Sequence, residues 1–209
     1  MKRYILSVFL MLIFVPSVLS ADFNFDAAVG YFAPNQTELA RKRLAASCDL
    51  GVGASYLFVR AGGRFWVVSS DEKNFDVPGY GDVSCKTDVN SISGLLFAGV
   101  RRPYGFFPRG VYPYGAVGVG YLYNTTRTRW ELGSAADEPV QTLALSKGQQ
   151  IFAVIAGIEA RFGIVGVFFE LDYFIADKVD METIDVSGNT VDPGSVDPKG
   201  VAILIGARF

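Results

Sequence analysis

Hydrophobic side chains recur at every second position along several stretches of the chain. In the last ten residues, one face of an extended chain carries only apolar side chains, which are Val201, Ile203, Ile205, Ala207 and Phe209. A period of two residues is typical of a β-strand, because successive side chains of a strand point to opposite faces. The C-terminal segment is therefore predicted to be a strand with one apolar face.

The same alternation defines eight segments and predicts an all-β fold. Each segment is about ten residues long, which is the length that a tilted strand needs to cross a lipid bilayer. An even number of antiparallel strands can close with both chain ends on one side. The expected fold is an eight-stranded antiparallel transmembrane β-barrel, with strands at residues 23–33, 49–58, 60–69, 91–102, 111–124, 152–162, 167–175 and 200–209.

The distribution of charge indicates which face of the strands meets lipid. In the segment 152–162, apolar side chains occupy one face, while Gly157, Glu159 and Arg161 occupy the other. A soluble antiparallel sheet and a secreted lipocalin-like carrier are the alternatives, but such a carrier needs an apolar interior and a polar exterior. Small residues and charges of both signs suit the lumen of a membrane barrel, so the apolar face is predicted to be outside.

The expected connections alternate between short and long. Short ones fall near residues 58–60, 103–110 and 163–166. Long ones cover residues 34–48, 70–90, 125–149 and 177–199. Outer-membrane barrels combine short periplasmic turns with long external loops, so this alternation predicts four long loops that face outward.

The N-terminus has the three parts of a secretory signal peptide. Residues 2–3 are basic, residues 4–15 form an apolar run, and small residues surround an expected cleavage site after Ser20 or Ala21. The run is shorter than the roughly 20 residues of a membrane-spanning helix. We therefore expect a signal peptide and a single barrel domain in the outer membrane of a Gram-negative bacterium, at residues 1–20 and 21–209.

One segment carries a family motif. Residues 111–121 read Val-Tyr-Pro-Tyr-Gly-Ala-Val-Gly-Val-Gly-Tyr, which resembles the Pro-Tyr-x-Gly-x-Gly-x-Gly-aromatic strand of the OmpW-like and opacity-protein group of eight-stranded outer-membrane barrels. Residues 157–162 and 169–173 resemble the sixth and seventh strands of that group, although Ala116 stands where the family often has glycine. The resemblance implies a porin-type barrel, and the apolar face ending at Phe209 resembles the signal that the barrel assembly machinery recognises.

Composition excludes several functional classes. The chain has 209 residues, 50% of them hydrophobic, and its formal net charge of −2 provides no basic field for nucleic acid. It has no histidine, so a Ser-His-Asp triad, a His-ligated zinc ion and a histidine general base are excluded. The known enzymes among outer-membrane barrels resemble one another in using a histidine. We therefore expect a protein that is not an enzyme and needs no cofactor or metal.

Charged residues fall on the inward face of the expected strands. An eight-stranded barrel is just wide enough for its own side chains, and isolated charges in such a space would be costly to desolvate. We therefore expect an ion-pair network that fills the lumen. The alternatives are a narrow polar pore and an acid/base pair of Glu159 with Glu170. The inward charges are Asp26, Asp49, Arg60, Arg64, Glu159, Arg161, Glu170, Asp172 and Arg208.

The two cysteines are expected at the external rim of the barrel. Cys48 precedes the second expected strand, and Cys85 lies late in the second long connection. The bacterial envelope is oxidising, which favours a disulfide between them. Free thiols are the alternative, because a disulfide needs the two Cα atoms within about 7 Å.

Two functions from different classes fit such a barrel. The first is a structural or surface-interaction role, with a filled lumen and loops that meet ligands or host surfaces. The second resembles the OmpW-like role, a conduit for small hydrophobic molecules that Leu57, Trp66, Phe168 and Leu204 would line. Expected partners are outer-membrane lipid and lipopolysaccharide, the barrel assembly machinery, and either a small hydrophobic ligand or an extracellular surface, but not nucleic acid.

Overall fold

The computed structural model describes residues 22–35, 42–54, 56–69, 72–77, 81–102, 109–132, 141–181, 183–186, 189–192 and 194–209. The expected signal peptide at residues 1–20 lies outside this part of the chain and stays a prediction. Within the described ranges, no helix is long and apolar enough to cross a membrane.

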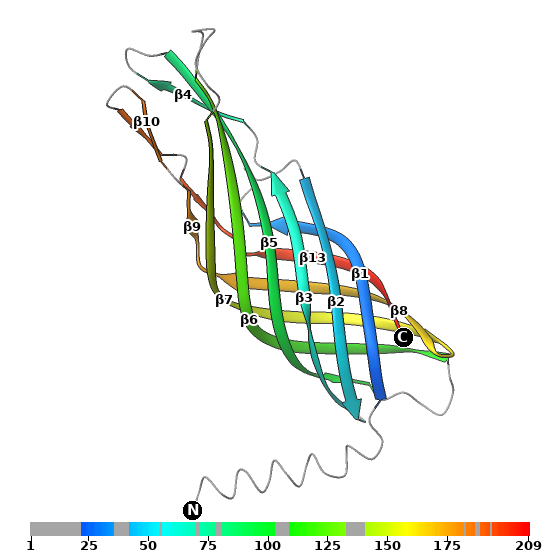
Figure 1. Ribbon diagram of the computed structural model, residues 1–209. Coiled ribbons are helices and arrows are strands. Elements are labelled where there is room, and N and C mark those ends of the chain that lie inside the picture. The colour runs from blue at the N-terminus through cyan, green and yellow to red at the C-terminus, as the bar shows by residue number, and fades with distance from the viewer. Residues whose placement is uncertain are drawn as a thin grey trace, which may run out of the picture.

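Eight antiparallel strands form a closed ring (Figure 1). The first and last strands close it, with Asp26 opposite Arg208. The ring passes directly from β3 to β5, because the short strand β4 pairs with β5 beyond the end of β3. The predicted eight-stranded antiparallel barrel is therefore confirmed. Its strands are β1 (Asp22–Pro34), β2 (Lys42–Ala54), β3 (Leu57–Ser69), β5 (Gly81–Arg101), β6 (Arg109–Leu132), β7 (Gln141–Phe162), β8 (Val165–Ala176) and β13 (Gly200–Arg208).

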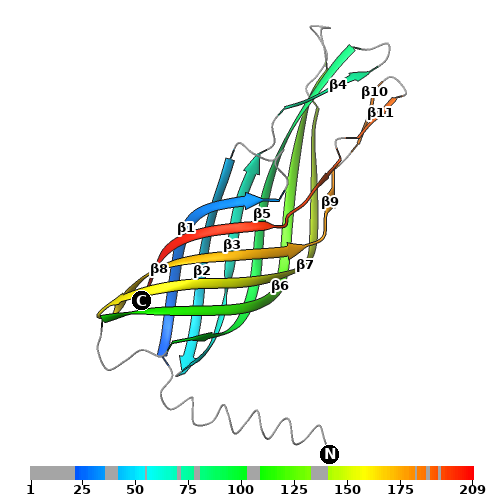
Figure 2. The same ribbon diagram turned by 180° about the vertical axis from the view of Figure 1, so that it is seen from behind.

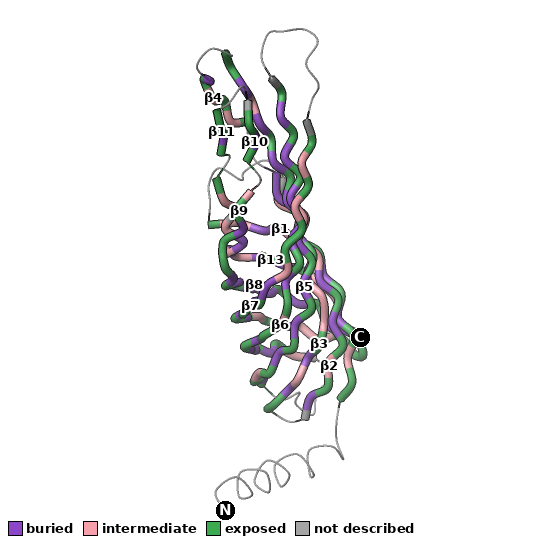
Figure 3. Tube along the Cα trace, turned by 60° about the vertical axis from the view of Figure 1, so that its left-hand side comes forward, coloured by how far each residue is buried: buried purple, intermediate pink, exposed green. Residues whose placement is uncertain are grey.

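The outward face of the ring is apolar. Exposed and buried side chains alternate along the strands, as Figure 3 shows around the ring. Large outward side chains are widely exposed, with 82% at Phe23 and 64% at Val117. A soluble monomer rarely exposes so extensive an apolar surface, whereas lipid solvates it. Exposed aromatic residues also lie toward both ends of the strands, which is typical of membrane interfaces; they include Phe23, Phe162 and Phe209 at one end and Tyr31, Tyr121 and Tyr123 toward the other.

Three strands continue beyond the ring into an extension (Figures 1 and 2). β5, β6 and β7 have 21, 24 and 22 residues, about twice the length that a membrane-crossing strand needs. β4 (Lys73–Val77) pairs with β5, β10 (Ile184–Val186) pairs with β11 (Asn189–Val191), and β9 (Val179–Asp180) pairs with β12 (Ser195–Val196). A second hydrophobic core stabilises the extension, formed by Val77, Val83, Cys85, Trp130, Ile184 and Val191.

The extension corrects the predicted long connections. Residues 42–48, 81–90, 125–132 and 141–149 are strand, although the prediction placed them in loops. The alternation continues through them: Val83 and Cys85 are buried, while Lys86 is exposed. The prediction ended each strand at the thickness of a bilayer, but a strand continues wherever an inward apolar face finds a second core.

The turn between β2 and β3 also differs from the prediction. It lies between Ala54 and Leu57, and not at residues 58–60. Phe58 was expected to face lipid but is buried, and Leu57 was expected in the conduit but is 51% exposed. The Phe58 ring meets the Tyr114 ring edge-on, with centroids 6.2 Å apart. The lumen therefore holds an aromatic ring at a position that hydrophobicity alone assigns to lipid.

Both cysteines are free thiols, so the predicted disulfide between Cys48 and Cys85 is wrong. Cys48 lies on the outward face of β2, opposite Ala27 of β1. Cys85 lies in the second core of the extension, opposite Trp130 of β6. The thiols thus occupy different environments, because β5 begins earlier than the prediction assumed.

The two thiols are expected to differ in reactivity. In detergent micelles, which exchange rapidly and admit water to the outer face of the ring, a membrane-soluble maleimide should modify the outward-facing Cys48. Burial raises the pKa of the Cys85 thiol, and the Lys73 ammonium opposes this only in part; little reactive thiolate is therefore available. Intact mass spectrometry of Cys48→Ser and Cys85→Ser variants would assign the labels. Rapid modification of Cys85 in the folded chain would contradict the second core.

Candidate functional site

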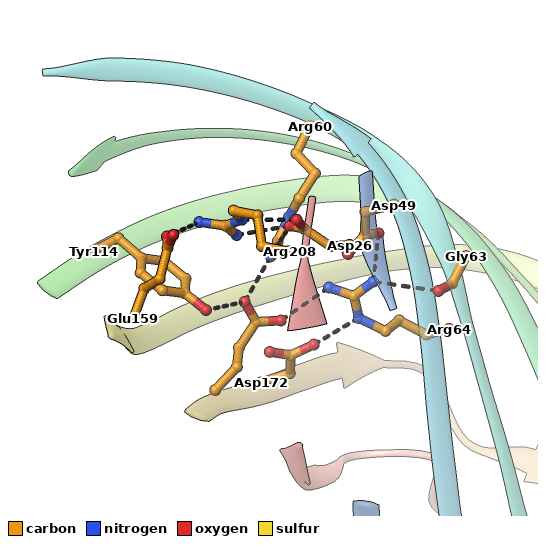
Figure 4. A network of polar contacts seen from close by, with 10 residues as sticks. Asp26, Asp49, Arg60, Gly63, Arg64, Tyr114, Glu159, Asp172 and Arg208 are labelled. Carbon is orange, nitrogen blue, oxygen red and sulfur yellow. Dashed lines mark hydrogen bonds and ion pairs between the residues drawn. The ribbon is translucent and has the colours of Figure 1, made fainter. Parts of the chain in front are cut away.

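Charged side chains from six strands of the ring meet inside it (Figure 4). Each occupies an inward position of its strand, and none is more than 5% exposed. They face inward because successive side chains of a strand point to opposite faces, and the other face of each strand meets lipid. We call this group the lumen network; it comprises Asp26 of β1, Asp49 of β2, Arg60 and Arg64 of β3, Glu159 of β7, Glu170 and Asp172 of β8, and Arg208 of β13.

Arg208 joins the last strand to the first. Its Nη2 and Nε lie 2.6 and 2.7 Å from the two carboxylate oxygens of Asp26. Its Nη1 lies 2.6 Å from Oε2 of Glu159. The guanidinium also lies over the rings of Tyr114 and Phe168, at 5.2 and 5.4 Å. A bidentate contact of this kind sets orientation as well as charge, because the planar fork matches the carboxylate.

Arg60 connects three strands across the ring. Its Nη2 lies 2.9 Å from Oε2 of Glu170, and its Nη1 lies 3.3 Å from Oδ2 of Asp26. Its Nε lies 3.6 Å from Oδ2 of Asp49. β1, β2 and β8 therefore all meet one side chain of β3.

Arg64 lies four residues beyond Arg60 on the same face of β3. Its Nη1 is 2.6 Å from Oδ1 of Asp49, and its Nε is 2.7 Å from Oδ2 of Asp172. Its Nη2 is 3.1 Å from Oε1 of Glu170. Three carboxylates thus surround one guanidinium, which a lysine with its single point charge could not reproduce.

Tyr114 completes the contacts around Glu170. Its hydroxyl donates to Oε2 of Glu170 at 2.8 Å. The sequence prediction did not include Tyr114, although it lies two residues from Tyr112 and Ala116 on the same buried face of β6. The available signal was its place in the two-residue alternation of β6, which puts Tyr114 on the lumen side. It was missed because only charged residues were considered as members of the polar network.

The lumen network contains five carboxyl groups and three guanidinium groups. Every carboxyl group contacts at least one arginine, and Asp26, Asp49 and Glu170 each contact two. Removing one partner of a buried ion pair leaves the other charge desolvated without compensation. Each arginine is therefore shared, and its loss would affect several strands at once.

Glycines make room for these side chains. A Cβ atom at Gly62 of β3 would collide with the carboxylate of Asp49, and one at Gly157 of β7 would collide with the ring of Tyr114. Both glycines occupy positions on the lumen side, where small residues allow bulky neighbours to cross the ring. The high glycine content of the strands therefore has a packing role in this crowded interior.

An aromatic stack lies beside the network, two positions along β3 toward the extension. The Trp66 ring packs against the rings of Phe32 and Phe174, with centroid distances of 5.1 and 4.8 Å. The planes are 21° and 26° from parallel, which is a stacked arrangement. All three side chains are at most 2% exposed. Polar and aromatic layers thus follow one another along the lumen.

The structure brings together all of the predicted network residues except Arg161. That residue lies at the end of β7, half-exposed, where its Nε donates to the carbonyl of Gly163 at 3.3 Å. The end of the strand is close to solvent, so a charge there needs no buried partner. Glu159 and Glu170 contact different arginines, so they do not form the acid/base pair that was the alternative.

The predicted C-terminal residues lie on the outward face of β13 and its end. Ile203, Ile205 and Phe209 are exposed, whereas Val201 and Ala207 are half-buried. Phe209 extends the ladder beyond Arg208: its N–H donates to the carbonyl of Phe25 at 2.9 Å and its carbonyl accepts from the same residue at 3.0 Å. The last residue is therefore part of the seam that closes the ring.

The charged groups of the described residues form no candidate metal site. The lumen network instead pairs each of its carboxyl groups with at least one arginine, which stays protonated in proteins. Its chemistry is structural pairing, and it links strands that are distant in the sequence.

No protein-family model and no curated protein matches the chain. Solved structures are similar to it. A major outer membrane protein from Thermus thermophilus matches with a TM-score of 0.53 and 16% identity, over 91% of this chain and 99% of that one. Ail, the attachment invasion locus protein of Yersinia pestis, has a TM-score of 0.42 and 13% identity over 90% and 97% of the chains. Neisserial surface protein A has a TM-score of 0.41 and 14% identity, over 90% of this chain and 97% of that one.

The closed ring, its apolar exterior and the likeness to the Thermus protein define the fold class. The chain has the fold of the eight-stranded outer-membrane β-barrels.

Proposed function

We propose that the protein is an integral outer-membrane barrel of a Gram-negative bacterium with a structural or surface-interaction role. In this proposal its own side chains close the lumen, and the extension faces outward. The protein performs no enzymatic reaction and needs no cofactor. The observation that carries the proposal is the lumen network, because it spans the ring with buried ion pairs that a transported solute would have to break.

The conduit is the weaker candidate. Of the residues expected to line it, Leu57 faces outward, while Trp66, Phe168 and Leu204 are buried at 1–2% exposure. Trp66 packs against both Phe32 and Phe174 and is 2% exposed, so it offers little free ring surface to a hydrophobic ligand. A ligand could enter only by separating these rings, and its own contacts would have to compensate for the packing energy that is lost.

Electrical recording tests the closed lumen. The full mature chain, reconstituted in a planar bilayer, is expected to give no stable single-channel steps, with a known porin as positive control. Uptake of a small hydrophobic dye by proteoliposomes should equal that of protein-free vesicles. Conductance or uptake by chains that migrate as folded barrels would overturn the proposal and favour the conduit.

The proposed partners follow from the surface of the ring. Lipid and lipopolysaccharide surround the apolar face, and the barrel assembly machinery receives the C-terminal strand during biogenesis. Residues 1–20 act as the signal peptide that directs the chain to the envelope. The extension provides the surface for extracellular contacts.

Deletion of Phe209 is expected to impair assembly. The deletion removes an exposed aromatic ring and the two backbone hydrogen bonds to Phe25, so β1 loses its last partner at the seam. Quantitative immunoblots of outer-membrane fractions should show a fall of about tenfold or more, a loss equivalent to about 1.4 kcal/mol of assembly free energy. Phe209→Tyr, which keeps the ring and the backbone, is the matched control. Unchanged levels of the deleted chain would contradict the proposed assembly signal.

A further inference from the structure

β7 has two parts that differ in their pairing. Residues 151–162 pair with β6 on one side and with β8 on the other. Residues 141–150 pair with β6 alone, because β8 ends at Ala176, opposite Ile151. Among the described residues, no strand pairs with the second edge of this upper part. At about 3.3 Å per residue, it presents a free backbone edge of roughly 33 Å at one side of the extension (Figure 1).

The rest of the extension is paired or covered. β4 lies along β5 at the opposite side of the sheet, so that its order is β4, β5, β6, β7. The hairpin of β10 and β11 contributes Ile184 and Val191 to the second core, where they pack with Val83 and Trp130 of β5 and β6. The hairpin thus covers the inner face of the sheet and does not extend its ladder. At the membrane end of the edge, the side-chain amide of Gln149 donates to the carbonyl of Asp177 at 2.9 Å.

The sequence of the edge carries only one of the usual protections against pairing, a single charge. Natural edge strands are kept apart by prolines, bulges, short length or inward-pointing charges. Residues 141–150 contain no proline, and their single charged residue, Lys147, shares the inner face with Leu143 and Leu145 but is exposed. Leu143 and Leu145 are half-buried on the inner face, with Leu143 packed against the second core. Side chains added beside them would extend this core.

We propose that the upper edge of β7 binds an extended segment of an extracellular protein as an added antiparallel strand. Alternate N–H and C=O groups of residues 141–150 would pair with the segment, which is the recognition mode of β-strand addition. The segment would place apolar side chains beside Leu143 and Leu145. The inference deepens the surface-interaction role proposed above by naming the surface and the class of partner.

The charges at the membrane end of the edge indicate which charge the N-terminal end of the bound segment should carry. Asp177 and Asp180 are exposed there beside Lys178, while Lys147 lies further along the edge, away from the membrane. β7 runs toward the membrane, so an antiparallel segment runs away from it, and its N-terminal residues lie beside these carboxylates. A segment with positive charges at its N-terminal end is therefore complementary.

Symmetry argues against a second copy of the chain as the occupant. Two barrels in one membrane are related by a twofold axis along the membrane normal, as in most closed dimers. Their β7 strands would then run parallel with identical residues at the same height. N–H would face N–H and C=O would face C=O, so the ladder could not form without an offset that the symmetry forbids.

Hydrogen exchange on the full mature chain in detergent micelles tests the proposal. The probe is the peptide Lys-Lys-Val-Thr-Val-Thr-Val-Thr-Val-Thr, and the control peptide carries N-methyl groups at alternate residues. Without peptide, alternate amides of residues 141–150 should exchange fast, whereas those of residues 125–132 in β6 are protected. The probe should slow the fast amides by about tenfold or more, and the control peptide should not.

Variants separate binding from folding. Ala144→Pro and Leu145→Pro are made in parallel, because backbone N–H groups alternate between the two edges of a strand. One of them removes a free donor and leaves the β6 ladder intact; that variant should migrate as a folded barrel and give no protection. Absence of protection in the wild-type chain, or protection that rises with barrel concentration without peptide, would overturn the proposal. Neither outcome affects the conductance test of the closed lumen.

Discussion

Replacement of Arg64 by methionine is expected to destabilise the folded barrel by about 3–5 kcal/mol. The substitution removes the nearest cation from the buried carboxyl groups of Asp49 and Asp172, and it leaves Glu170 with Arg60 alone. Methionine fills much of the volume, so the loss reports charge more than packing. Denaturant unfolding in lipid vesicles, followed by the shift between folded and unfolded bands on electrophoresis, measures the change in free energy.

Arg129→Met is the matched control, because Arg129 contacts Glu131 at 3.3 Å but is 61% exposed. Exposed pairs contribute about 0–1 kcal/mol, so its unfolding should change little. Adding Asp172→Asn to Arg64→Met removes one uncompensated carboxylate and should recover part of the loss, since neighbouring sites in one network are coupled. Equal effects at Arg64 and Arg129 would contradict the buried network.

Replacement of Trp66 by alanine is expected to cost about 3–5 kcal/mol. The substitution would leave a cavity in place of the indole against which both Phe32 and Phe174 stack. The same vesicle unfolding assay measures the loss. Because the stack closes a layer of the lumen, we also expect brief conductance events in planar bilayers from this variant.

Phe65→Ala is the control for Trp66→Ala, since the two residues are adjacent on β3 and face opposite ways. Phe65 is 43% exposed on the outer face, where lipid can fill the vacated volume. Its loss should therefore destabilise the barrel less than the loss of Trp66. A larger effect at Phe65 would mean that the two faces of β3 are assigned the wrong way round.

Alternation made the ring predictable from sequence. In β8, lipid on one side and the packed lumen on the other impose the two-residue period on every position, so the pattern alone was enough to place Glu170 and Asp172 inside. The same parity placed Arg60 and Arg64 together on β3. Charges are reliable markers of the inward face, because lipid excludes them.

Apolar residues were less informative, since the lumen also accepts them. Phe58 fits either face by hydrophobicity, and only its contact with Tyr114 shows that it lies inside. The turn that precedes it was misplaced for this reason. Tyr114 was likewise missed as a network member, because a tyrosine at an inward position resembles ordinary packing until its hydrogen bond to Glu170 is known.

The extension was not predicted, because bilayer thickness was taken as the limit of each strand. Trp130 and Cys85 are opposite one another in the β5–β6 ladder, beyond the part of β5 that pairs with β3 in the ring. Their core depends on Ile184 and Val191, which a two-residue period within β5 or β6 cannot reveal. Contacts between distant loops are therefore the part of the fold that sequence pattern alone leaves open.

Membrane extraction tests the central claim of an integral outer-membrane barrel most directly. Membranes that contain the mature chain are washed with high salt and alkaline carbonate and then treated with detergent. The protein is expected to stay in the membrane through both washes and to be released by detergent, because its apolar outer face is solvated by lipid. Release by salt or carbonate alone, without detergent, would contradict the barrel and return the chain to a soluble or peripheral class.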